Sequence, residues 1–456
     1  MTVYTVILII FSVVGVIGLG TVFWSAMGLL RLVIEREGGS SLHRAQPTGP
    51  SLDEVAVLIA AHNEELTIGR TLESVGALIP LRQVFVISDG SSDRTAEIVT
   101  GYGANLLELN PNRGKAGALA AGVKHFRLRD SFEVVMLLDA DTEPDEHYFD
   151  TGLPLFAEPD VVAVAGRAAT AHDFTTGSLS SRILLAYRER LYVLVQLMMK
   201  YGQAFPTLNV VSIVPGFASM YRTRILEDID IEAPGLVIED FNMTFEVHAK
   251  RLGRVAFHPQ AAIAYTQDPD NLRDYVKQVQ RWVLGFWQTV RRHRFHRGAF
   301  WVALAVYIVE LLLSCLLWVL LIPVLVISSA AGIIAALHPG TDPGLELVSG
   351  LLPPLALLVG VVLPDLVLTV FAAVVTRRTV FLRVGLAFPL LKILDAVLCF
   401  RSLVRMFTAT STGRWTSPSR RPVAGTAGPV AATARSVPVT EAPVQPSELS
   451  GAGGGR

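Results

Sequence analysis

Three long apolar stretches constrain this chain more than any other feature, because each is long enough to cross a membrane. They are Tyr4–Leu32, Trp301–Leu337 and Leu347–Val375. A helix needs about 20 predominantly apolar residues to span roughly 30 Å of bilayer hydrocarbon. Only 17% of the 456 residues are charged, but the middle of the chain is polar. We therefore expect a membrane protein with a globular domain between its first two apolar stretches.

Charges beside these stretches predict how the chain crosses the membrane. Arg31 lies at the end of the first stretch, Arg36 and Arg44 follow it, and no charged side chain precedes it. Arginines in 291–297 precede the second stretch, and Arg377 and Arg378 follow the third. Because Lys and Arg accumulate on the cytoplasmic side, we expect an external N-terminus, a cytoplasmic globular domain and a hairpin that goes out and returns. The predicted location is the cell membrane, with several crossings.

The C-terminal region is less regular. Charged residues interrupt the apolar stretch Val380–Phe407, and each would cost on the order of 3 kcal/mol at the bilayer centre. We expect this stretch to lie in the membrane plane. The tail after Trp415 lacks apolar periodicity and is predicted to be disordered. The expected divisions are an N-terminal helix (1–35), a globular domain (51–268), interfacial helices (269–300), membrane helices (301–410) and the tail (411–456).

Two further features concern single residues in the apolar stretches. Pro323 and Pro364 are expected to kink the helices that contain them. Cys315 and Cys399 both lie among apolar residues, and no CxxC pair exists. We expect two buried free thiols rather than a disulfide or a metal site.

The polar middle of the chain predicts an α/β domain with a mainly parallel sheet. Short apolar runs at Val55–Ala60, Val84–Ser88 and Val134–Leu138 alternate with helix-like stretches at Asp93–Thr100 and Lys115–Phe126. Ligands of such sheets bind beyond the carboxyl ends of the strands. The formal net charge is −1, which predicts no broad basic surface and no nucleic-acid partner.

Carboxylates follow two of these runs. Asp139 and Asp141 come after a five-residue apolar run, and their hard oxygens suit Mg²⁺ or Mn²⁺ held jointly with a diphosphate. Solvated aspartates after a strand are the alternative. Asp89 ends another run, at a position where it could contact the ribose or base of a bound nucleotide. Ser91–Asp93 fit a turn and a helix cap better. Lys115 follows a glycine-containing loop and could reach a phosphate, or could be solvated.

Two later motifs also combine polar and aromatic residues. Glu239 and Asp240 precede a helix-like run, which they could simply cap. Gln278, Arg281 and Trp282 form a Gln-x-x-Arg-Trp motif in an aromatic and basic stretch. Trp282 could instead be an interfacial anchor, an interpretation that its neighbours Phe286, Trp287 and Trp301 support.

In this order, the motifs resemble those of the family 2 membrane glycosyltransferases, which include cellulose, chitin, hyaluronan and bacterial poly-N-acetylglucosamine synthases. The resemblance covers Asp53–Arg297. It implies an α/β GT-A-like nucleotide-sugar transferase domain flanked by transmembrane helices. Three departures, Ile238 for Thr, Ala60 for Pro and Ala120 for Asn, remove no titratable group.

The resemblance also implies roles for single residues. Asp89 would hold the uracil or ribose of a UDP-sugar with help from Lys115, and Asp139 and Asp141 would bind nucleotide and metal. Asp240, next to Glu239, would be the general base. The residues implied at the diphosphate and the acceptor are Gln278, Arg281, Trp282 and Gly216, the last in a small-residue loop that continues to Arg222.

The expected reaction is an inverting transfer of sugar onto a growing β-linked polysaccharide. Arg414–Arg420 resembles the carboxyl end of poly-N-acetylglucosamine synthases, which favours UDP-N-acetylglucosamine as donor. A non-processive enzyme that makes a glycolipid is the main alternative. A transferase acting on dolichol or undecaprenyl phosphate usually lacks Gln-x-x-Arg-Trp, and a nucleotide-sugar receptor would not need Asp240. With so few membrane helices, we expect a second copy or a small membrane subunit to complete a sugar channel.

Overall fold

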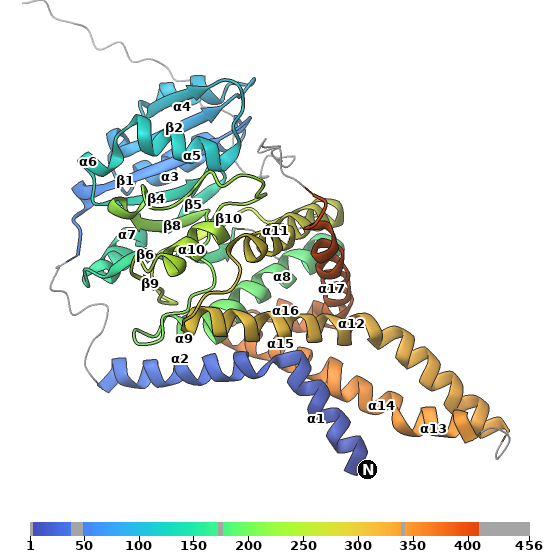
Figure 1. Ribbon diagram of the computed structural model, residues 1–456. Coiled ribbons are helices and arrows are strands. Elements are labelled where there is room, and N and C mark those ends of the chain that lie inside the picture. The colour runs from blue at the N-terminus through green and yellow to red at the C-terminus, as the bar shows by residue number, and fades with distance from the viewer. Residues whose placement is uncertain (1–2, 38–48, 172–176, 339–342, 410–456) are drawn as a thin grey trace, which may run out of the picture. The chain divides into compact units, whose positions relative to one another are not determined.

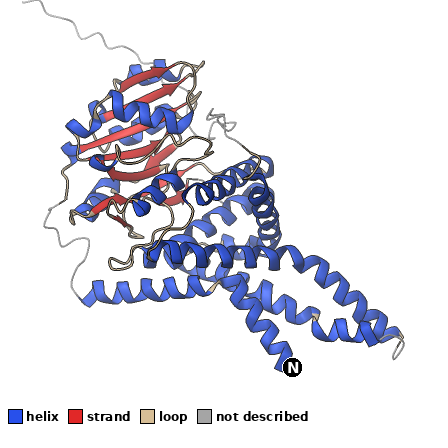
Figure 2. Cartoon of the chain, viewed as in Figure 1, coloured by secondary structure: helices blue, strands red, loops and turns tan. Residues whose placement is uncertain are grey.

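The structure is a computed structural model that describes residues 3–37, 49–171, 177–338 and 343–409. The described residues all belong to one compact unit. The strands gather in one part of this unit, and the remainder is helical (Figure 2). The predicted tail and its Arg414–Arg420 motif lie outside the described residues.

A seven-stranded mixed sheet in the order β3–β2–β1–β4–β8–β6–β9 forms the core of the globular part (Figure 1). Its strands are β1 (Val55–Ala61), β2 (Val84–Asp89), β3 (Asn105–Leu109), β4 (Val134–Asp139), β6 (Val161–Val164), β8 (Ala218–Arg222) and β9 (Arg254–Ala256). Among them β8 is antiparallel to both of its neighbours, β4 and β6, and the other pairings are parallel. A three-stranded sheet accompanies it, built of β5 (Thr142–Pro144), β10 (Ile263–Thr266) and β7 (Arg167–Thr170).

Helices cover both faces of the large sheet, which explains why β1 is apolar at every position. On one face, α5 (Gly114–His125) packs against β1 and β2. A Cβ at Gly122 would lie 2.6 Å from Ile87, so only glycine permits this close approach. The other face carries α3 (Ile68–Gly76), whose Leu72 and Val75 are buried. The remaining helices of this part are α4 (Thr95–Tyr102), α6 (Leu128–Ser131), α7 (Tyr148–Gly152), α8 (Leu179–Leu194), α9 (Tyr201–Gln203), α10 (Asp240–Ala249) and α11 (Leu272–His293).

The first apolar stretch was expected to be one helix, but it is two. α1 (Val3–Ile17) and α2 (Leu19–Glu37) meet at Gly18 with a bend of 63°. Gly18 has a φ of +84°, which glycine adopts without strain. The N–H of Gly20 donates to Oε1 of Glu310 at 2.7 Å, so a carboxylate from a later apolar helix satisfies the broken backbone.

Two helical segments, Ala299–Leu337 and Pro343–Thr376, are long and apolar enough to cross a membrane, and the α1–α2 pair could add a third crossing. The first segment is α12, which runs unbroken through Pro323. The second contains α13 (Pro343–Leu351), α14 (Pro354–Leu357), a π-helical turn and α15 (Leu363–Thr376). The stretch Val380–Phe407, expected to lie in the membrane plane, forms α16 (Val380–Val384) and α17 (Phe388–Arg405), neither of which is among these candidates.

Candidate active site

Lys115, near the start of α5, lies at the centre of the candidate site. Its Nζ is 2.6 Å from Asp139 Oδ1 and 3.0 Å from Glu239 Oε1. It also donates to the carbonyl oxygen of Gly216 at 3.2 Å. The end of β4, the residue before α10 and the loop before β8 therefore converge on one cation. The structure brings these four sequence-predicted residues into direct contact.

The two carboxyl groups before and at the start of α10 have different pKa values. Burial raises the pKa of Asp240 to about 6, and the neighbouring Glu239 carboxylate adds to the rise. Burial is the largest single effect on Glu239 and would raise its pKa, but the charge and hydrogen bond of Lys115, a backbone hydrogen bond and the charge of Arg281 together lower the pKa of Glu239. Glu239 is therefore the ion-pair partner, while Asp240 is a carboxyl whose pKa suits a general base working near neutral pH.

Gly216 makes the approach of these groups possible. A Cβ there would lie 3.0 Å from Glu239 Oε1 and 3.3 Å from Lys115 Nζ. The N–H of Gly216 also points to Asp240 Oδ2 at 3.5 Å. The sequence predicts a loop from Gly216 to Arg222. This prediction is wrong from Ala218 onward, because Ala218–Arg222 is the fully buried strand β8. Hydrogen bonding to both β4 and β6 overrides the small-residue composition of this segment.

Asp89 contacts the backbone of its own chain. Its Oδ1 accepts from the N–H of Arg113 at 2.8 Å, and its Oδ2 accepts from the N–H of Gly114 at 2.7 Å. Burial raises the pKa of Asp89, against the effect of these two donors. The carboxylate thus fixes the start of α5, and with it the position of Lys115. A donor-binding role for Asp89 stays a prediction.

Asp139 and Asp141 both line the same cavity. Burial raises the pKa of Asp139, and the Asp141 carboxylate adds to this rise while Lys115 opposes it. The described residues hold no group of three or more His, Cys, Asp or Glu that could bind a metal ion by itself. A cation at this pair would therefore need further oxygen ligands, which a diphosphate could supply.

Gln278, Arg281 and Trp282 share one face of α11 and line the cavity. Arg188 of α8 holds this face in place. Its Nη2 donates to Gln278 Oε1 at 3.1 Å, and its guanidinium carbon lies 4.1 Å from the centroid of the Trp282 ring. Its Nε also donates to Asp268 Oδ1 at 3.3 Å. Phe286, Trp287 and Trp301 are buried as well, which does not fit the interfacial-anchor interpretation.

The cavity has a volume of about 1290 Å³. It reaches from the acidic cluster to the apolar helices, where the acidic cluster means Lys115, Asp139, Asp141, Gly216, Glu239 and Asp240. Its lining there includes Trp318 of α12 and Lys392 and Asp395 of α17. Tyr187 and Tyr275 donate to Asp395 at 2.8 and 2.6 Å. Two of the charges that interrupt the last apolar stretch, Lys392 and Asp395, therefore face a cavity. The two cysteines, Cys315 and Cys399, are buried and free, as expected, and line it too.

Residues 56–230 match the family model described as glycosyl transferase family 2. This chain contains a family 2 glycosyltransferase domain. The matched residues include Lys115, Asp139, Asp141 and Gly216 of the acidic cluster, whereas Asp240 and the face of α11 lie outside them. The mixed sheet of this domain is the GT-A-like fold that the resemblance implied.

Relatives of the family 2 domain include polysaccharide synthases. The chain is 26% identical over 285 residues to a poly-beta-1,6-N-acetyl-D-glucosamine synthase of Staphylococcus epidermidis, covering 59% of this chain and 66% of the relative. It is 27% identical over 290 residues to the synthase of Staphylococcus aureus strain COL, covering 60% and 66%. The match thus spans slightly less than two thirds of these relatives. Among solved structures, a mannosyltransferase from Pyrobaculum calidifontis in complex with GDP-Man and Mn²⁺ has a TM-score of 0.48 and 16% identity, covering 84% of this chain and 99% of that one.

Sequence reasoning missed three charged residues that line the cavity of the family 2 domain, namely Arg188, Lys200 and Asp268. All three are at most 5% exposed. One pattern could have revealed the first, because Arg188, Glu189 and Arg190 are consecutive charges in a helix that is mostly apolar after Arg182. Buried charges need partners, so such a run predicts polar contacts with other segments.

Proposed function

We propose that this chain is an integral membrane glycosyltransferase that moves N-acetylglucosamine from UDP-N-acetylglucosamine onto a growing β-linked polysaccharide. The observation that carries the proposal is the position of Asp240. This carboxyl lies beside the Lys115–Glu239–Asp139 cluster, at a cavity that continues between the apolar helices. The names of the Staphylococcus relatives support the choice of sugar and of a polymeric product.

The proposed reaction is one inverting displacement. The Asp240 carboxylate takes the proton of an acceptor hydroxyl, whose oxygen attacks the anomeric carbon. The new glycosidic bond forms as the bond from that carbon to the diphosphate breaks, and UDP leaves with the electron pair. Because the pKa of Asp240 is about 6, it is mostly ionised at neutral pH and still basic enough to help. Arg281, an exposed cation lining the cavity, would stabilise charge growing on the diphosphate.

A divalent cation fits the carboxylate pair. The Asp141 charge raises the pKa of Asp139, so two close carboxylates repel one another, and a cation between them would relieve this. Asp139 and Asp141 would hold Mg²⁺ or Mn²⁺ together with diphosphate oxygens. The ion would supply positive charge that makes UDP a better leaving group. Lys115 would then remain with Glu239, which it already contacts at 3.0 Å.

The extension of the cavity favours a long acceptor. An enzyme that adds one sugar to a lipid needs room for one acceptor headgroup, whereas this cavity of about 1290 Å³ passes Trp282 and reaches Lys392 and Asp395. Aromatic faces and polar side chains along its length suit a bound saccharide chain.

Turnover and product size test the proposal. The full-length protein in detergent, given UDP-N-acetylglucosamine with Mg²⁺ or Mn²⁺, should release UDP and form a polymer. Asp240→Asn should lower turnover by at least 10²-fold and leave UDP binding intact, because it removes a base and keeps the shape. Asp130→Asn, an exposed site on α6, is the control. Wild-type turnover in Asp240→Asn would refute the assignment of Asp240 as the base. A product with a single sugar on each lipid would show that the enzyme makes a glycolipid and not a polysaccharide.

We also propose a multi-pass cell-membrane location with the family 2 domain in the cytoplasm. Arg291 and Arg292 at the end of α11 precede α12, and Arg377 follows α15, which supports a hairpin with both ends inside. A single cysteine placed at Ser417, in a chain with Cys315 and Cys399 replaced by alanine, should resist a membrane-impermeant reagent in intact cells. Strong labelling would mean that Val380–Phe407 spans the membrane.

A further inference from the structure

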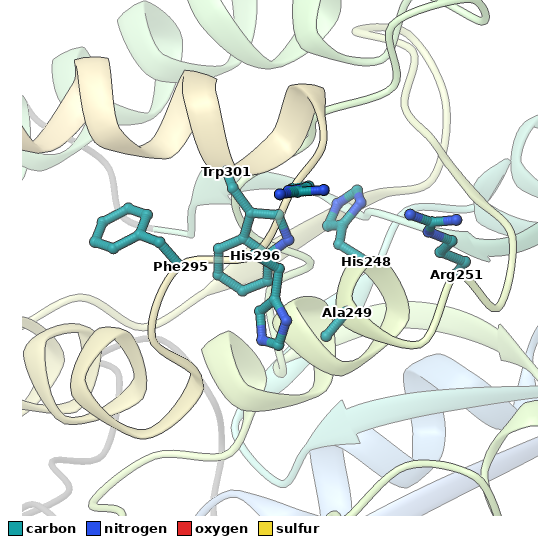
Figure 3. Close-up of a pocket in the computed structure, with 7 residues that line it drawn as sticks. His248, Ala249, Arg251, Phe295, His296 and Trp301 are labelled. Carbon is teal, nitrogen blue, oxygen red and sulfur yellow. The ribbon is translucent and has the colours of Figure 1, made fainter.

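A second cavity lies away from the proposed active site, at the start of α12. Its volume is about 580 Å³, and it shares none of its lining residues with the larger cavity. His248 reaches it from the end of α10 and Arg251 from just beyond that end. Phe295 and His296 reach it from the segment that leads into α12, and Trp301 from the first turn of α12 (Figure 3). Arg297 completes its charged lining.

The charge of this pocket is positive. No described carboxylate lines it. Within the described residues, neither Arg251 nor Arg297 forms an ion pair or a side-chain hydrogen bond. Arg292, nearby in sequence, pairs with Asp230 at 2.5 Å, and Arg291 donates to the carbonyl oxygen of Met406 at 2.8 Å. Neither of the two arginines that face the pocket is thus used by the fold itself.

The walls of the pocket are fixed by aromatic contacts. The His248 ring stacks on Phe300 with 4.0 Å between centroids, and its Nε2 lies 3.0 Å from the carbonyl oxygen of Val211. Burial lowers the pKa of His248 to about 4, so this ring is neutral and the arginines supply the charge. The His296 ring lies 4.7 Å from that of Trp301. Such a pocket can bind an anion without ordering its own walls first.

The surroundings place this pocket where a membrane surface would lie. α12, the longer candidate membrane helix, begins at Ala299 beside it. Phe295, which lines the pocket, is 55% exposed, and Val302, the neighbour of the lining residue Trp301 in sequence, is 65% exposed, so apolar surface accompanies the two arginines. A ligand that fits both the arginines and the apolar surface has an anionic group at the level of the lipid headgroups and acyl chains next to it.

We propose that this pocket binds a phosphate group, supplied by an anionic phospholipid of the leaflet in which α12 begins. The two guanidiniums bind the phosphate oxygens, for which their fork geometry is suited. Phe295 and Val302 contact the acyl chains. The proposal does not depend on the proposed transferase function, because the pocket and the acidic cluster have no lining residue in common.

Binding is the readout, since α10 links this pocket to Asp240 and activity alone would mix the two sites. Native mass spectrometry of the full chain in detergent should show phosphatidylglycerol retained in preference to phosphatidylcholine. Each arginine beside an anionic surface contributes roughly fivefold in affinity. The double variant Arg251→Gln/Arg297→Gln should therefore bind phosphatidylglycerol about 25-fold more weakly. Arg82→Gln/Arg94→Gln, at two exposed arginines that precede β2 and α4 and do not line the pocket, removes the same charge as a control.

A second arm separates a lipid from a soluble anion. Inorganic phosphate at constant ionic strength should be added to both variants and to the parent protein, with the unfolding temperature as readout. Phosphate could raise the unfolding temperature of the parent protein but not of the Arg251/Arg297 variant, while mass spectrometry shows no preference for phosphatidylglycerol. The pocket would then be a phosphate site, but its ligand would be a soluble phosphate and not a lipid. Equal binding of phosphatidylglycerol and of phosphate by all three proteins would overturn the proposal.

Discussion

A buried ion pair between α8 and α15 gives the sharpest test of how the sheet domain is joined to the apolar helices. Arg190 donates from Nη1 to Asp365 Oδ2 at 3.0 Å and from Nη2 to Asp365 Oδ1 at 2.9 Å. Nη1 also donates to Thr369 Oγ1 at 2.7 Å. The side chains of Arg190 and Asp365 are 0% and 1% exposed. Removing one partner leaves the other as an uncompensated buried charge.

The magnitude follows from this burial. Arg190→Met or Asp365→Leu should each lower the free energy of unfolding by about 3–5 kcal/mol. The combined variant leaves no buried charge and should be markedly more stable than either single one, although Thr369 loses a donor. Arg129→Met is the control. Arg129 pairs with Glu227, and their side chains are 51% and 60% exposed, so this ion pair contributes about 1 kcal/mol or less to stability.

Unfolding of the full chain in detergent, titrated with sodium dodecyl sulfate and followed by tryptophan fluorescence, measures these differences. The double-mutant cycle should show a coupling of several kcal/mol between Arg190 and Asp365, about 3 at least. If the losses of unfolding free energy in the two single variants simply add in the combined variant, the reasoning is refuted. Additive losses would mean that the two side chains do not compensate each other.

Three further predictions concern the acidic cluster. Asp139→Ala or Asp141→Ala should abolish metal-dependent UDP binding in calorimetry, and unaltered affinity with Mg²⁺ or Mn²⁺ would make the pair structural. Because Asp240 must be ionised to accept a proton and its pKa is about 6, kcat/KM should rise as pH increases through about 6. Glu239→Gln should move this rise to lower pH, since it removes a like charge, and an unmoved limb would speak against Asp240 as the titrating group. Gly216→Ala, whose methyl would lie 3.0 Å from Glu239 Oε1, should lower turnover by roughly 10²-fold without changing the unfolding midpoint.

The sequence was sufficient to predict the strands that position the cluster. β1, β2 and β4 are apolar runs buried on both faces, and their carboxyl ends meet at one edge of the sheet. This is why Asp89 and Asp139 could be placed at the ligand-binding edge of the sheet. The direct contact of Lys115 with Glu239 could not be derived in this way, because 124 positions separate the two residues and no local pattern joins them.

Other parts could not be predicted, because contacts between distant segments decide them. β8 lies between β4 and β6, and only this pairing explains why a segment rich in small residues is a strand. The bend at Gly18 depends on Glu310, 290 positions away from Gly20. Arg188 acquires its place in the cavity from Gln278 and Asp268.

Charged residues within the apolar stretches indicated that distant contacts exist, but they did not identify the partner residues. Glu310 accepts from Gly20, Asp365 pairs with Arg190, and Asp395 accepts from two tyrosines of α8 and α11. Two of these three contacts tie apolar helices to α8 or α11, the helices that supply Arg188 and Trp282 to the cavity. A charge in an apolar helix persists only where a partner compensates it. The apolar helices α15 and α17 therefore fix the helices that form one wall of the cavity, and a fragment ending before α12 would lose that support.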